Sequence, residues 1–292
     1  MERIEFEVLT AAAENKPMKA GFAGNEIKET VDRLEKALLL NNGKITEKGL
    51  EALEPYRVKS VVFMAAGFGS RMVPLTLNTP KPLVRVHGKR IIDTLLDAVT
   101  AIGIEDIYIV RGYLGEQFEL LKKKYPTIKL IDNPDYDGTG TISSFYYARN
   151  LLDNTYVMES DLVVNNPSVI RKYRYRSGFM GHKVEETDDW YLKTENGFIS
   201  EVGCKGSGDN CYKLVGISYW DHEDGKKLAH DIEEAYNGPD GHKLSMSFIP
   251  FRIYKEHYQA EIMPCAENDI TEIDSFRELQ AFDETYTVFG GM

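Results

Sequence analysis

The sequence predicts an α/β fold, and three observations carry this prediction. Residues 61–66 are apolar without alternation, which is typical of a strand that is covered on both faces of a sheet. Further on, strand patterns at 105–110 and 129–132 alternate with helix patterns at 91–102 and 118–125. A length of 292 residues is enough for one large domain and a small additional one.

The small domain is expected at residues 1–57 and the main domain at 58–292. Two helices are predicted before residue 41, the second from the apolar spacing of Ile27, Val31 and Leu34. The sequence Asn-Asn-Gly at 41–43 indicates a turn, and Lys-Ile-Thr-Glu-Lys-Gly-Leu follows at 44–50. This order of helix, helix and turn resembles a small winged-helix module.

The charge of the first domain argues against binding to DNA. Residues 1–57 contain nine Lys or Arg against eleven Asp or Glu, a net charge of about −2, and no basic helix. We therefore expect a packing or dimerising role for this domain, and a homodimer is left open.

Composition excludes further classes of protein. A formal net charge of −11 argues against a general nucleic-acid binder, because phosphates are neutralised by clustered Lys and Arg. No apolar run approaches the length of a membrane span, and the first residues form no signal peptide, so we expect a cytoplasmic protein. Cys204, Cys211 and Cys265 form no Cys-x-x-Cys pair and are expected to be reduced thiols.

A glycine turn follows the first strand of the predicted sheet. Gly67 and Gly69 let backbone amides approach a phosphate, and Ser70 and Arg71 add a hydroxyl and a fixed cation. The nicotinamide fingerprint would need a third glycine at Met72, and a P-loop would need Gly-Lys-Ser or Gly-Lys-Thr. The turn is interpreted as a phosphate site of another kind, with an ordinary glycine turn as the alternative.

Lys81 is the second element of this pattern. It lies between Pro80 and Pro82, which restrict the backbone and keep the loop from becoming helical. The ammonium is therefore expected to point back at the glycine turn, whereas the alternative is an incidental surface lysine. The pairing of turn and lysine is more specific than either part.

The combined motif resembles the signature of the sugar-phosphate and alcohol-phosphate nucleotidyltransferases. Within that superfamily it is most similar to CTP:phosphocholine cytidylyltransferases of the bacterial type, over about residues 58–280. The resemblance implies a Rossmann-like nucleotidyltransferase domain with a mixed central sheet. The residues that carry it are Ala65, Ala66, Gly67, Phe68, Gly69, Ser70, Arg71, Met72, Pro74, Thr76, Pro80, Lys81 and Leu83.

The resemblance also implies a nucleotide site. The implied residues in and before the glycine turn are Ala65, Ala66, Gly67, Gly69 and Ser70. Gly112 and Tyr113 follow the second strand of the sheet, at the end where ligands bind in doubly wound sheets. An ordinary strand-to-helix turn explains these two residues equally well.

A polar, glycine-rich loop at 133–145 opens the next predicted helix. Its amides and hydroxyls suit a base edge or a ribose, and the family reads the pyrimidine with the equivalent loop. The candidate residues are Gly140, Thr141 and Ser144. Cytidylyltransferases for phosphocholine often have paired asparagines where this sequence has Gly140 and Thr141, so the sequence leaves CTP or UTP open.

Acidic residues predict a Mg²⁺ site. Asp161 ends a predicted central strand at 154–161, beside the phosphate-binding turns. Glu272 and Asp274 lie in a segment that matches the Glu-Ile-Asp-Ser pattern of the family, and strand alternation would place both on one face. The alternative is that Asp161 and Asp274 cap the helices that follow them.

Aromatic residues predict the acceptor site. Trp190, Tyr191, Tyr219 and Trp220 lie near acidic residues, and aromatic faces bind a quaternary ammonium that has no donor hydrogen. The alternative is that these aromatic side chains fill a core.

The predicted function is Mg²⁺-dependent transfer of CMP from CTP to phosphocholine, which gives CDP-choline and pyrophosphate. Arg71 and Lys81 are the predicted catalytic cations. Alternative acceptors are 2-aminoethylphosphonate or, with another nucleotide such as UTP, a sugar 1-phosphate. A nucleotide-sensing winged-helix regulator is the alternative of a different class.

Overall fold

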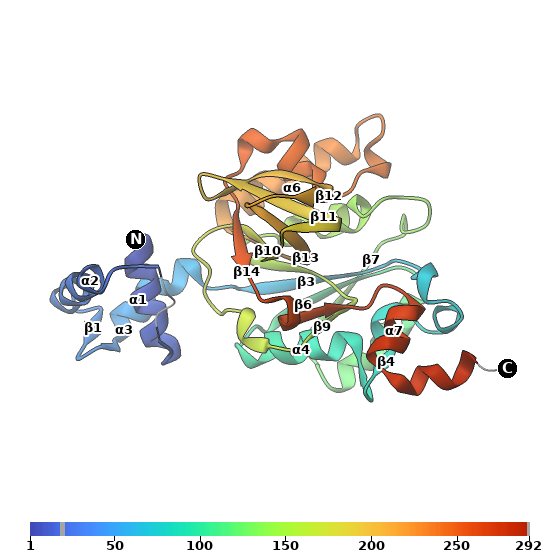
Figure 1. Cartoon of the computed structure of the whole chain (residues 1–292), viewed down its shortest axis with the longest axis horizontal. Helices are drawn as coiled ribbons and strands as arrows, with labels where there is room; N and C mark the ends of the chain where they lie inside the picture. Colours follow the sequence, from blue (N-terminus) through green and yellow to red (C-terminus); the bar gives the residue numbers. More distant parts are fainter. Residues whose placement is uncertain (18–20, 291–292) are drawn as a thin grey trace. The chain divides into compact units, whose positions relative to one another are not determined.

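The computed structural model describes residues 1–17 and 21–290, which divide into two units (Figure 1). The first unit contains Met1–Val58 and also Tyr173–Tyr175, and the second contains the rest of the chain. The sequence had assigned Tyr173–Tyr175 to the main domain. The local sequence does not predict that Tyr173–Tyr175 belong to the first unit, because this depends on packing between segments far apart in the chain.

The described residues of the first unit form three α-helices, a hairpin and a short 3₁₀ helix at Glu54–Tyr56. Its elements are α1 (Arg3–Glu14), α2 (Gly24–Lys36), β1 (Leu40–Asn41), β2 (Lys44–Ile45) and α3 (Glu47–Leu53). The predicted turn is confirmed, since Asn42 and Gly43 have φ of 49° and 72° and connect β1 to β2 in a two-residue loop. The winged-helix assignment stays a prediction.

A separate apolar core holds the first unit together. Phe6 and Leu9 of α1 pack with Leu34 of α2, Leu53 of α3 and Tyr173, and all five side chains are buried. The unit therefore has a core of its own, as a domain requires.

Four parallel strands form one half of the large sheet in the second unit. β3 (Ser60–Ala65) lies between β8 (Thr155–Glu159) and β6 (Asp106–Arg111), and β7 (Ile128–Asp132) follows β6. Val61, Val62 and Phe63 have no exposed surface, as expected for a strand that is covered on both faces.

Antiparallel pairing extends the sheet beyond β8. The remaining strands are β10 (Gly178–Lys183), β11 (Glu186–Glu195), β12 (Phe198–Ser207), β13 (Cys211–Trp220) and β14 (Glu261–Pro264). The strand β13 pairs antiparallel with β8, β10 and β11, whereas β10 and β14 are parallel. This mixed sheet confirms the predicted fold class.

The strands β11 and β12 form a hairpin, as the Asn-Gly pair at 196–197 indicates in the sequence. Thr194 pairs with Ile199 and Glu195 with Phe198. The connecting residues Asn196 and Gly197 have φ of 52° and 85°, the backbone that a tight hairpin turn requires.

Helices cover the sheet of the second unit on both faces. They are α4 (Ile91–Ala101), α5 (Ile142–Ala148), α6 (His222–Tyr236) and α7 (Phe276–Phe282). In Figure 1, α4 and α7 lie below β3 and β6, whereas α6 lies above them. Each described helix is too short or too polar to span a membrane.

Two further short pairings complete the second unit. β4 (Arg85–Val86) pairs with β5 (Lys89–Arg90) before α4, and β9 (Leu162–Val164) pairs antiparallel with β15 (Ile270–Glu272). The second of these pairings brings residues near the C-terminus beside the end of β8.

The helix that the sequence predicts at 118–125 is present, but with other boundaries. A 3₁₀ helix covers Gly115–Lys123 instead. Its buried residues are Gly115, Phe118 and Leu121, which are spaced by three. A helix with three residues per turn aligns all three on one side, whereas an α-helix would spread them over about 120°.

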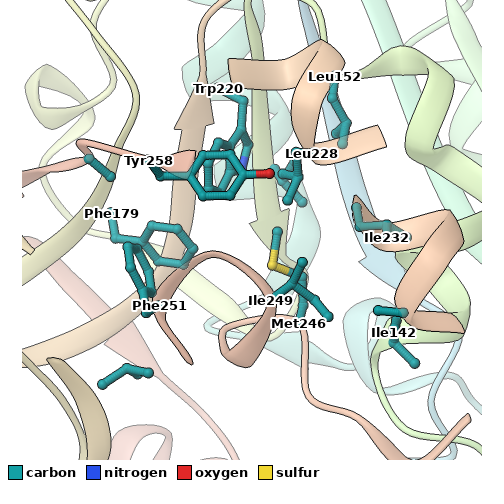
Figure 2. Close-up of a cluster of buried hydrophobic side chains, with 14 of the residues drawn as sticks. Ile142, Leu152, Phe179, Trp220, Leu228, Ile232, Met246, Ile249, Phe251 and Tyr258 are labelled. Atoms are coloured by element: carbon teal, nitrogen blue, oxygen red, sulfur yellow. The ribbon is translucent and has the colours of Figure 1, made fainter. Parts of the chain in front are cut away.

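Two apolar clusters matter for the site. Figure 2 shows the larger one, in which Trp220, Phe179 and Phe251 pack with Tyr258 and Ile249. The second, which we call the supporting cluster, has the buried members Met72, Val84, Val86, Ile91, Val163, Ile273 and Leu279.

Candidate active site

The glycine turn begins where β3 ends, next to the ends of β6 and β8. Ligands of open α/β sheets bind at the carboxyl ends of parallel strands, so this edge is the expected location of a site. Ala65 and Ala66 are buried, whereas Gly67 and Ser70 are exposed. The two alanines can therefore offer a ligand little besides their backbone.

Position 69 requires a glycine for two reasons, which are its backbone conformation and the close approach of neighbouring side chains. Its φ of 67° is in the left-handed region, and a Cβ would lie 3.0 Å from Lys81 Cβ and 3.1 Å from Thr76 Cγ2. The Thr76 hydroxyl donates to the Gly69 carbonyl at 2.9 Å. The turn is thus packed directly against the lysine loop.

Lys81 points at two carboxylates. Its Nζ donates to Asp161 Oδ2 at 2.7 Å and to Asp274 Oδ1 at 2.8 Å, and its side chain is only 10% exposed. The Arg71 guanidinium forms an ion pair with the other oxygen of Asp274. The structure thus brings together four residues that the sequence singled out for catalysis and metal binding.

Lys81 keeps its charge in this position. Burial of the ammonium acts to lower the pKa of Lys81, but attraction and hydrogen bonds from Asp161 and Asp274 outweigh burial, and the pKa is raised above its ordinary value. The residue is therefore a permanent cation at neutral pH.

The pairing of β9 with β15 assembles an acidic group. Carboxylate oxygens of Glu159, Asp161 and Glu272 lie within 4.8 Å of one another. Among the described residues, Asp161 Oδ1 is buried and has no hydrogen-bond partner. Clustered carboxylates with an unpartnered oxygen fit a hard divalent cation.

Asp274 reaches the site differently from the prediction. The strand β15 ends at Glu272, so alternation does not extend to Asp274, which lies in the turn before α7. The Ile273 amide donates to the Asp161 carbonyl at 3.1 Å and places Asp274 beside Lys81 instead. Glu272 belongs to the acidic group, and Asp274 is connected to it through the lysine.

The capping alternatives for the two aspartates are wrong. Ser275 caps α7 and accepts from the Glu278 amide at 3.2 Å. Asn166 caps the short helix after β9. The carboxylates of Asp161 and Asp274 are therefore free of a structural role at a helix terminus.

Glu159 belongs to the site although the sequence prediction did not include it. It ends β8 and faces Gly216 of β13, where an added Cβ would lie 2.5 Å from Glu159 Oε2. The missing side chain of Gly216 therefore leaves room for the Glu159 carboxylate. Its position two residues before Asp161 on a predicted strand was the available signal, because such residues share a face.

Among the described residues, neither glutamate of the acidic group forms an ion pair, and the charge of Lys81 only partly offsets the repulsion on them. Solvent reaches Glu159, but the surrounding protein still desolvates its carboxylate; this desolvation, and then repulsion from Asp161 and Glu272, raise the pKa of Glu159 to about 8. Desolvation, followed by repulsion from Asp161 and Asp274, likewise raises the pKa of Glu272 to about 7. A positive ligand would relieve this repulsion.

Gly112 and Tyr113 join the end of β6 to the glycine turn. The Tyr113 amide donates to the Ala66 carbonyl at 3.0 Å, and its hydroxyl donates to the Leu77 carbonyl at 3.1 Å. A Cβ on Gly112 would lie 2.5 Å from the Tyr136 ring. Both residues therefore fix the loops around the turn, and their role toward a nucleotide stays a prediction.

The candidates in the loop at 133–145 are engaged within the protein. The Gly140 amide donates to the His242 carbonyl at 2.6 Å, and the Thr141 hydroxyl accepts from the Met246 amide at 3.1 Å. Ser144 is buried and accepts from Asn133 Nδ2 at 3.0 Å. These groups shape the loop, and their predicted contact with a base is untested.

The predicted aromatic cage does not form. Tyr219 and Trp220 have no exposed surface, because neighbouring residues of β13 point to opposite faces of the sheet and both faces are covered. The Tyr219 hydroxyl donates to Asn154 Oδ1 at 3.0 Å, and Trp220 belongs to the larger apolar cluster (Figure 2). Neither residue can contact an acceptor, so the core-filling alternative applies to both.

Trp190 and Tyr191 differ from each other in exposure. Tyr191 is also buried, with its ring over Gly206 of β12 and its hydroxyl on Glu201. Trp190 keeps part of its surface and packs against Phe248 at 5.5 Å between ring centroids. Trp190 is the one predicted acceptor residue that retains more than marginal exposure in the described part of the chain.

Comparisons with known proteins agree with this arrangement. A family model described as Nucleotidyl transferase matches residues 60–190. A 2-aminoethylphosphonate cytidylyltransferase of Lancefieldella rimae is 37% identical over 231 residues, which cover 78% of this chain and 93% of that protein.

Two solved structures also align with most of this chain. A CTP:phosphocholine cytidylyltransferase from Streptococcus pneumoniae aligns with a TM-score of 0.71 and 31% identity, over 78% of this chain and 99% of that chain. An inositol-1-phosphate CTP transferase from T. maritima, at 14% identity and a TM-score of 0.63, covers 80% of this chain and 95% of that chain and shares the fold.

Proposed function

The chain belongs to the nucleotidyl transferase family and is a cytidylyltransferase, and we propose that it transfers CMP from CTP to an acceptor with an anionic phosphorus group and a primary ammonium. 2-Aminoethylphosphonate is the proposed acceptor. The observation that supports this choice is the position of Glu159 and Glu272 beside Lys81, together with the burial of Tyr219 and Trp220.

The proposed reaction needs little proton transfer. A phosphonate oxygen of the acceptor attacks the α-phosphorus of CTP, and a new P–O bond forms. The bond from the α-phosphorus to the oxygen that bridges to the β-phosphorus breaks, and pyrophosphate leaves with that oxygen. The attacking oxygen is already largely ionised near neutral pH, so catalysis depends on positioning and on neutralising charge.

Lys81 and Arg71 supply the fixed positive charge. Lys81 is buried and held next to the glycine turn, so its ammonium can move from the carboxylates to the α-phosphate and the acceptor. Arg71 is exposed at the same turn and is proposed to bind the pyrophosphate group. Preorganised cations stabilise the charge that develops during transfer.

A Mg²⁺ ion is proposed as the cofactor. Asp161, through its unpartnered Oδ1, and Asp274 are the residues that would hold it, next to the oxygens of Glu272 and Glu159. When bound, the ion would neutralise charge on the phosphates of CTP.

The acceptor amine is proposed to lie at Glu159 and Glu272. Within the described chain, neither carboxylate accepts a hydrogen bond from the protein. A primary ammonium donates three hydrogen bonds and is well matched to two carboxylates, whereas a quaternary ammonium donates none. The arrangement therefore favours a primary amine over choline.

Transfer to phosphocholine is the second candidate. It is supported by the likeness to the solved phosphocholine enzyme and by Trp190, which keeps part of its surface. A single aromatic face still attracts a quaternary ammonium.

Pyrophosphate release distinguishes these candidates. With CTP and Mg²⁺ constant, kcat/KM is measured for 2-aminoethylphosphonate, phosphoethanolamine, phosphocholine and a sugar 1-phosphate. We expect both primary amines to exceed phosphocholine by at least about ten-fold, the scale of one hydrogen bond to a charged group. Equal or better use of phosphocholine would move the assignment to the second candidate. Activity with the sugar phosphate alone would reject both.

A further inference from the structure

Tyr136, in the loop at 133–145, has an aromatic ring that the protein leaves exposed. The loop follows β7, and the Tyr136 side chain is 37% exposed. Among the described residues, its hydroxyl forms no hydrogen bond and its ring pairs with no other aromatic ring. The groups that the sequence singled out in this loop are engaged within the protein, namely Gly140, Thr141 and Ser144. Unlike these three, the Tyr136 ring remains open to a ligand.

The Tyr136 side chain lies next to the glycine turn. A Cβ on Gly112 would lie 2.5 Å from Tyr136 Cγ and 2.8 Å from the Ala66 carbonyl oxygen. Both atoms therefore border the same side of Gly112, at the carboxyl ends of β3 and β6. Gly67 follows Ala66 directly in the chain. An exposed ring and the turn that is predicted to bind phosphate are thus neighbours at the edge of the sheet where ligands bind.

A carboxylate fixes the backbone beside this ring. Asp135 Oδ2 accepts from the hydroxyl of Tyr147 in α5 and from that of Tyr236 in α6, each at 2.7 Å. The hydrogen bond from Tyr147, followed by the one from Tyr236, lowers the pKa of Asp135 below its ordinary value, so the carboxylate is ionised at neutral pH. The Thr139 hydroxyl donates to the Asp135 carbonyl. Two helices and the loop itself therefore hold Asp135, and the Tyr136 ring extends from a fixed point.

An exposed aromatic ring in a fixed position suits a flat ligand. Nucleobases stack on aromatic side chains, and every base offers a face for this contact. We propose that Tyr136 is a nucleotide-binding residue whose ring stacks on the base of the nucleoside triphosphate, and that Asp135 is the positioning residue that holds it there. The inference rests on the proposed function for the nucleotide but not for the acceptor. Stacking of this kind adds affinity without selecting among bases.

Calorimetric titration of the full chain with CTP, at constant Mg²⁺ and without acceptor, tests the stack. Tyr136→Leu keeps an apolar side chain over Gly112 and removes the aromatic face. We expect the Kd of CTP to rise by about five-fold to 100-fold, the range for one base stacked on an aromatic ring. Tyr136→Phe keeps the face and should bind CTP within about two-fold of wild type. Inorganic triphosphate, which has no base, should bind wild type and both variants alike.

A double variant tests the positioning role of Asp135. Asp135→Asn preserves shape and removes the charge to which two hydroxyls donate, so the Kd of CTP should rise by about three-fold to ten-fold. If Asp135 acts through the ring, the same change should add less than about two-fold in a chain that already carries Tyr136→Leu. Asp106→Asn is the control, because Asp106 is an exposed partner of Lys129 at the opposite end of β6, and it should leave the Kd unchanged.

The outcomes distinguish this inference from the proposed function. A CTP affinity of Tyr136→Leu equal to that of wild type, or an equal loss of affinity for inorganic triphosphate, would overturn the base contact and leave the transfer reaction intact. Full additivity of Asp135→Asn with Tyr136→Leu would reject the positioning role. Failure of wild type to bind CTP would reject the proposed function together with the inference. If circular dichroism shows that Tyr136→Leu does not fold, Tyr136→Met, which also lacks an aromatic face, serves in its place.

Discussion

At the scale of single residues, four carboxylates and two cations face one another, and this imbalance determines what the site can take up. The two aspartates are paired with Lys81 and Arg71, whereas Glu159 and Glu272 form no ion pair in the part of the chain that the structure describes. Desolvation by the surrounding protein and mutual repulsion raise the pKa values of these glutamates to about 8 and about 7. A bound cation favours their ionised forms, so positive charge on a substrate or metal is attracted to them.

Glu159→Gln tests the role of this imbalance in acceptor binding. The substitution preserves shape beside Gly216 and removes the charge. We expect the KM for 2-aminoethylphosphonate to rise by about ten-fold to 100-fold, the range of a hydrogen bond to a charged group, while the KM for CTP changes by less than about two-fold. Steady-state kinetics with each substrate varied in turn measure both constants.

Glu195→Gln is the matched control, because Glu195 is exposed at the end of β11 next to the hairpin turn. It should leave both constants unchanged. An equal rise in both KM values for Glu159→Gln would contradict a role in acceptor binding. Loss of Mn²⁺ binding would make Glu159 a metal ligand instead.

At the scale of elements, the supporting cluster fixes the positions of the charged residues relative to one another. Met72 follows Arg71 directly, Ile273 precedes Asp274, and Val163 lies two residues after Asp161. Three separate segments of the chain thus contribute one apolar side chain each to a common core and one charged side chain to the site. Rigid packing of this kind keeps catalytic groups within the small tolerances that transfer reactions require.

Ile273→Ala tests this support. Ile273 is fully buried, and such a truncation costs about 2–5 kcal/mol of unfolding free energy. We also expect turnover at a temperature where the variant is folded to fall by at least about ten-fold, because Asp274 moves relative to Lys81. Denaturant unfolding and pyrophosphate release measure the two effects.

Leu228→Ala provides the comparison, since Leu228 is equally buried but belongs to the larger cluster. It should lose similar stability and keep turnover within about three-fold, as expected for a cavity in a cluster that contributes no charged side chain to the site. If both variants lose turnover alike, the supporting cluster has no special role.

Local sequence was sufficient for the elements whose structure depends on neighbours in the chain. The apolar run at 61–66 predicted β3. The Asn-Gly pair at 196–197 indicated the hairpin turn, and the prolines around Lys81 indicated a fixed loop. Each of these follows from backbone preference or burial pattern within a few residues.

Local sequence failed where packing between distant segments decides. Tyr219 and Trp220 were predicted as a pair at one site, although adjacent residues of a strand point to opposite faces. Trp220 is buried by segments that come later in the chain, such as α6 and Tyr258, whereas Tyr219 packs on Tyr156 of the earlier strand β8. Glu159 was missed for the related reason that Gly216, which leaves space for it, lies 57 positions away.

At the scale of the whole molecule, the chain contains two units with separate cores, and the candidate site lies within one of them. Every charged residue of the site belongs to the second unit, as do the central sheet and the supporting cluster. The solved phosphocholine enzyme is covered over 99% of its length by 78% of this chain, so about a fifth of this chain has no counterpart in it. Catalysis should therefore not depend on the first unit.

Deleting residues 1–57 tests this expectation. The shortened chain retains the site and its cores, and we expect kcat/KM for CTP and the acceptor to stay within about three-fold of the full chain, as for a domain that folds independently. Its stability and solubility should fall, because Tyr173 loses the core formed with Phe6 and Leu53. Phe6→Ala in the full chain is the matched control, since it disrupts only that core and should leave kcat/KM unchanged. A shortened chain that is folded by circular dichroism but inactive, together with an inactive Phe6→Ala variant, would show that the first unit takes part in the reaction.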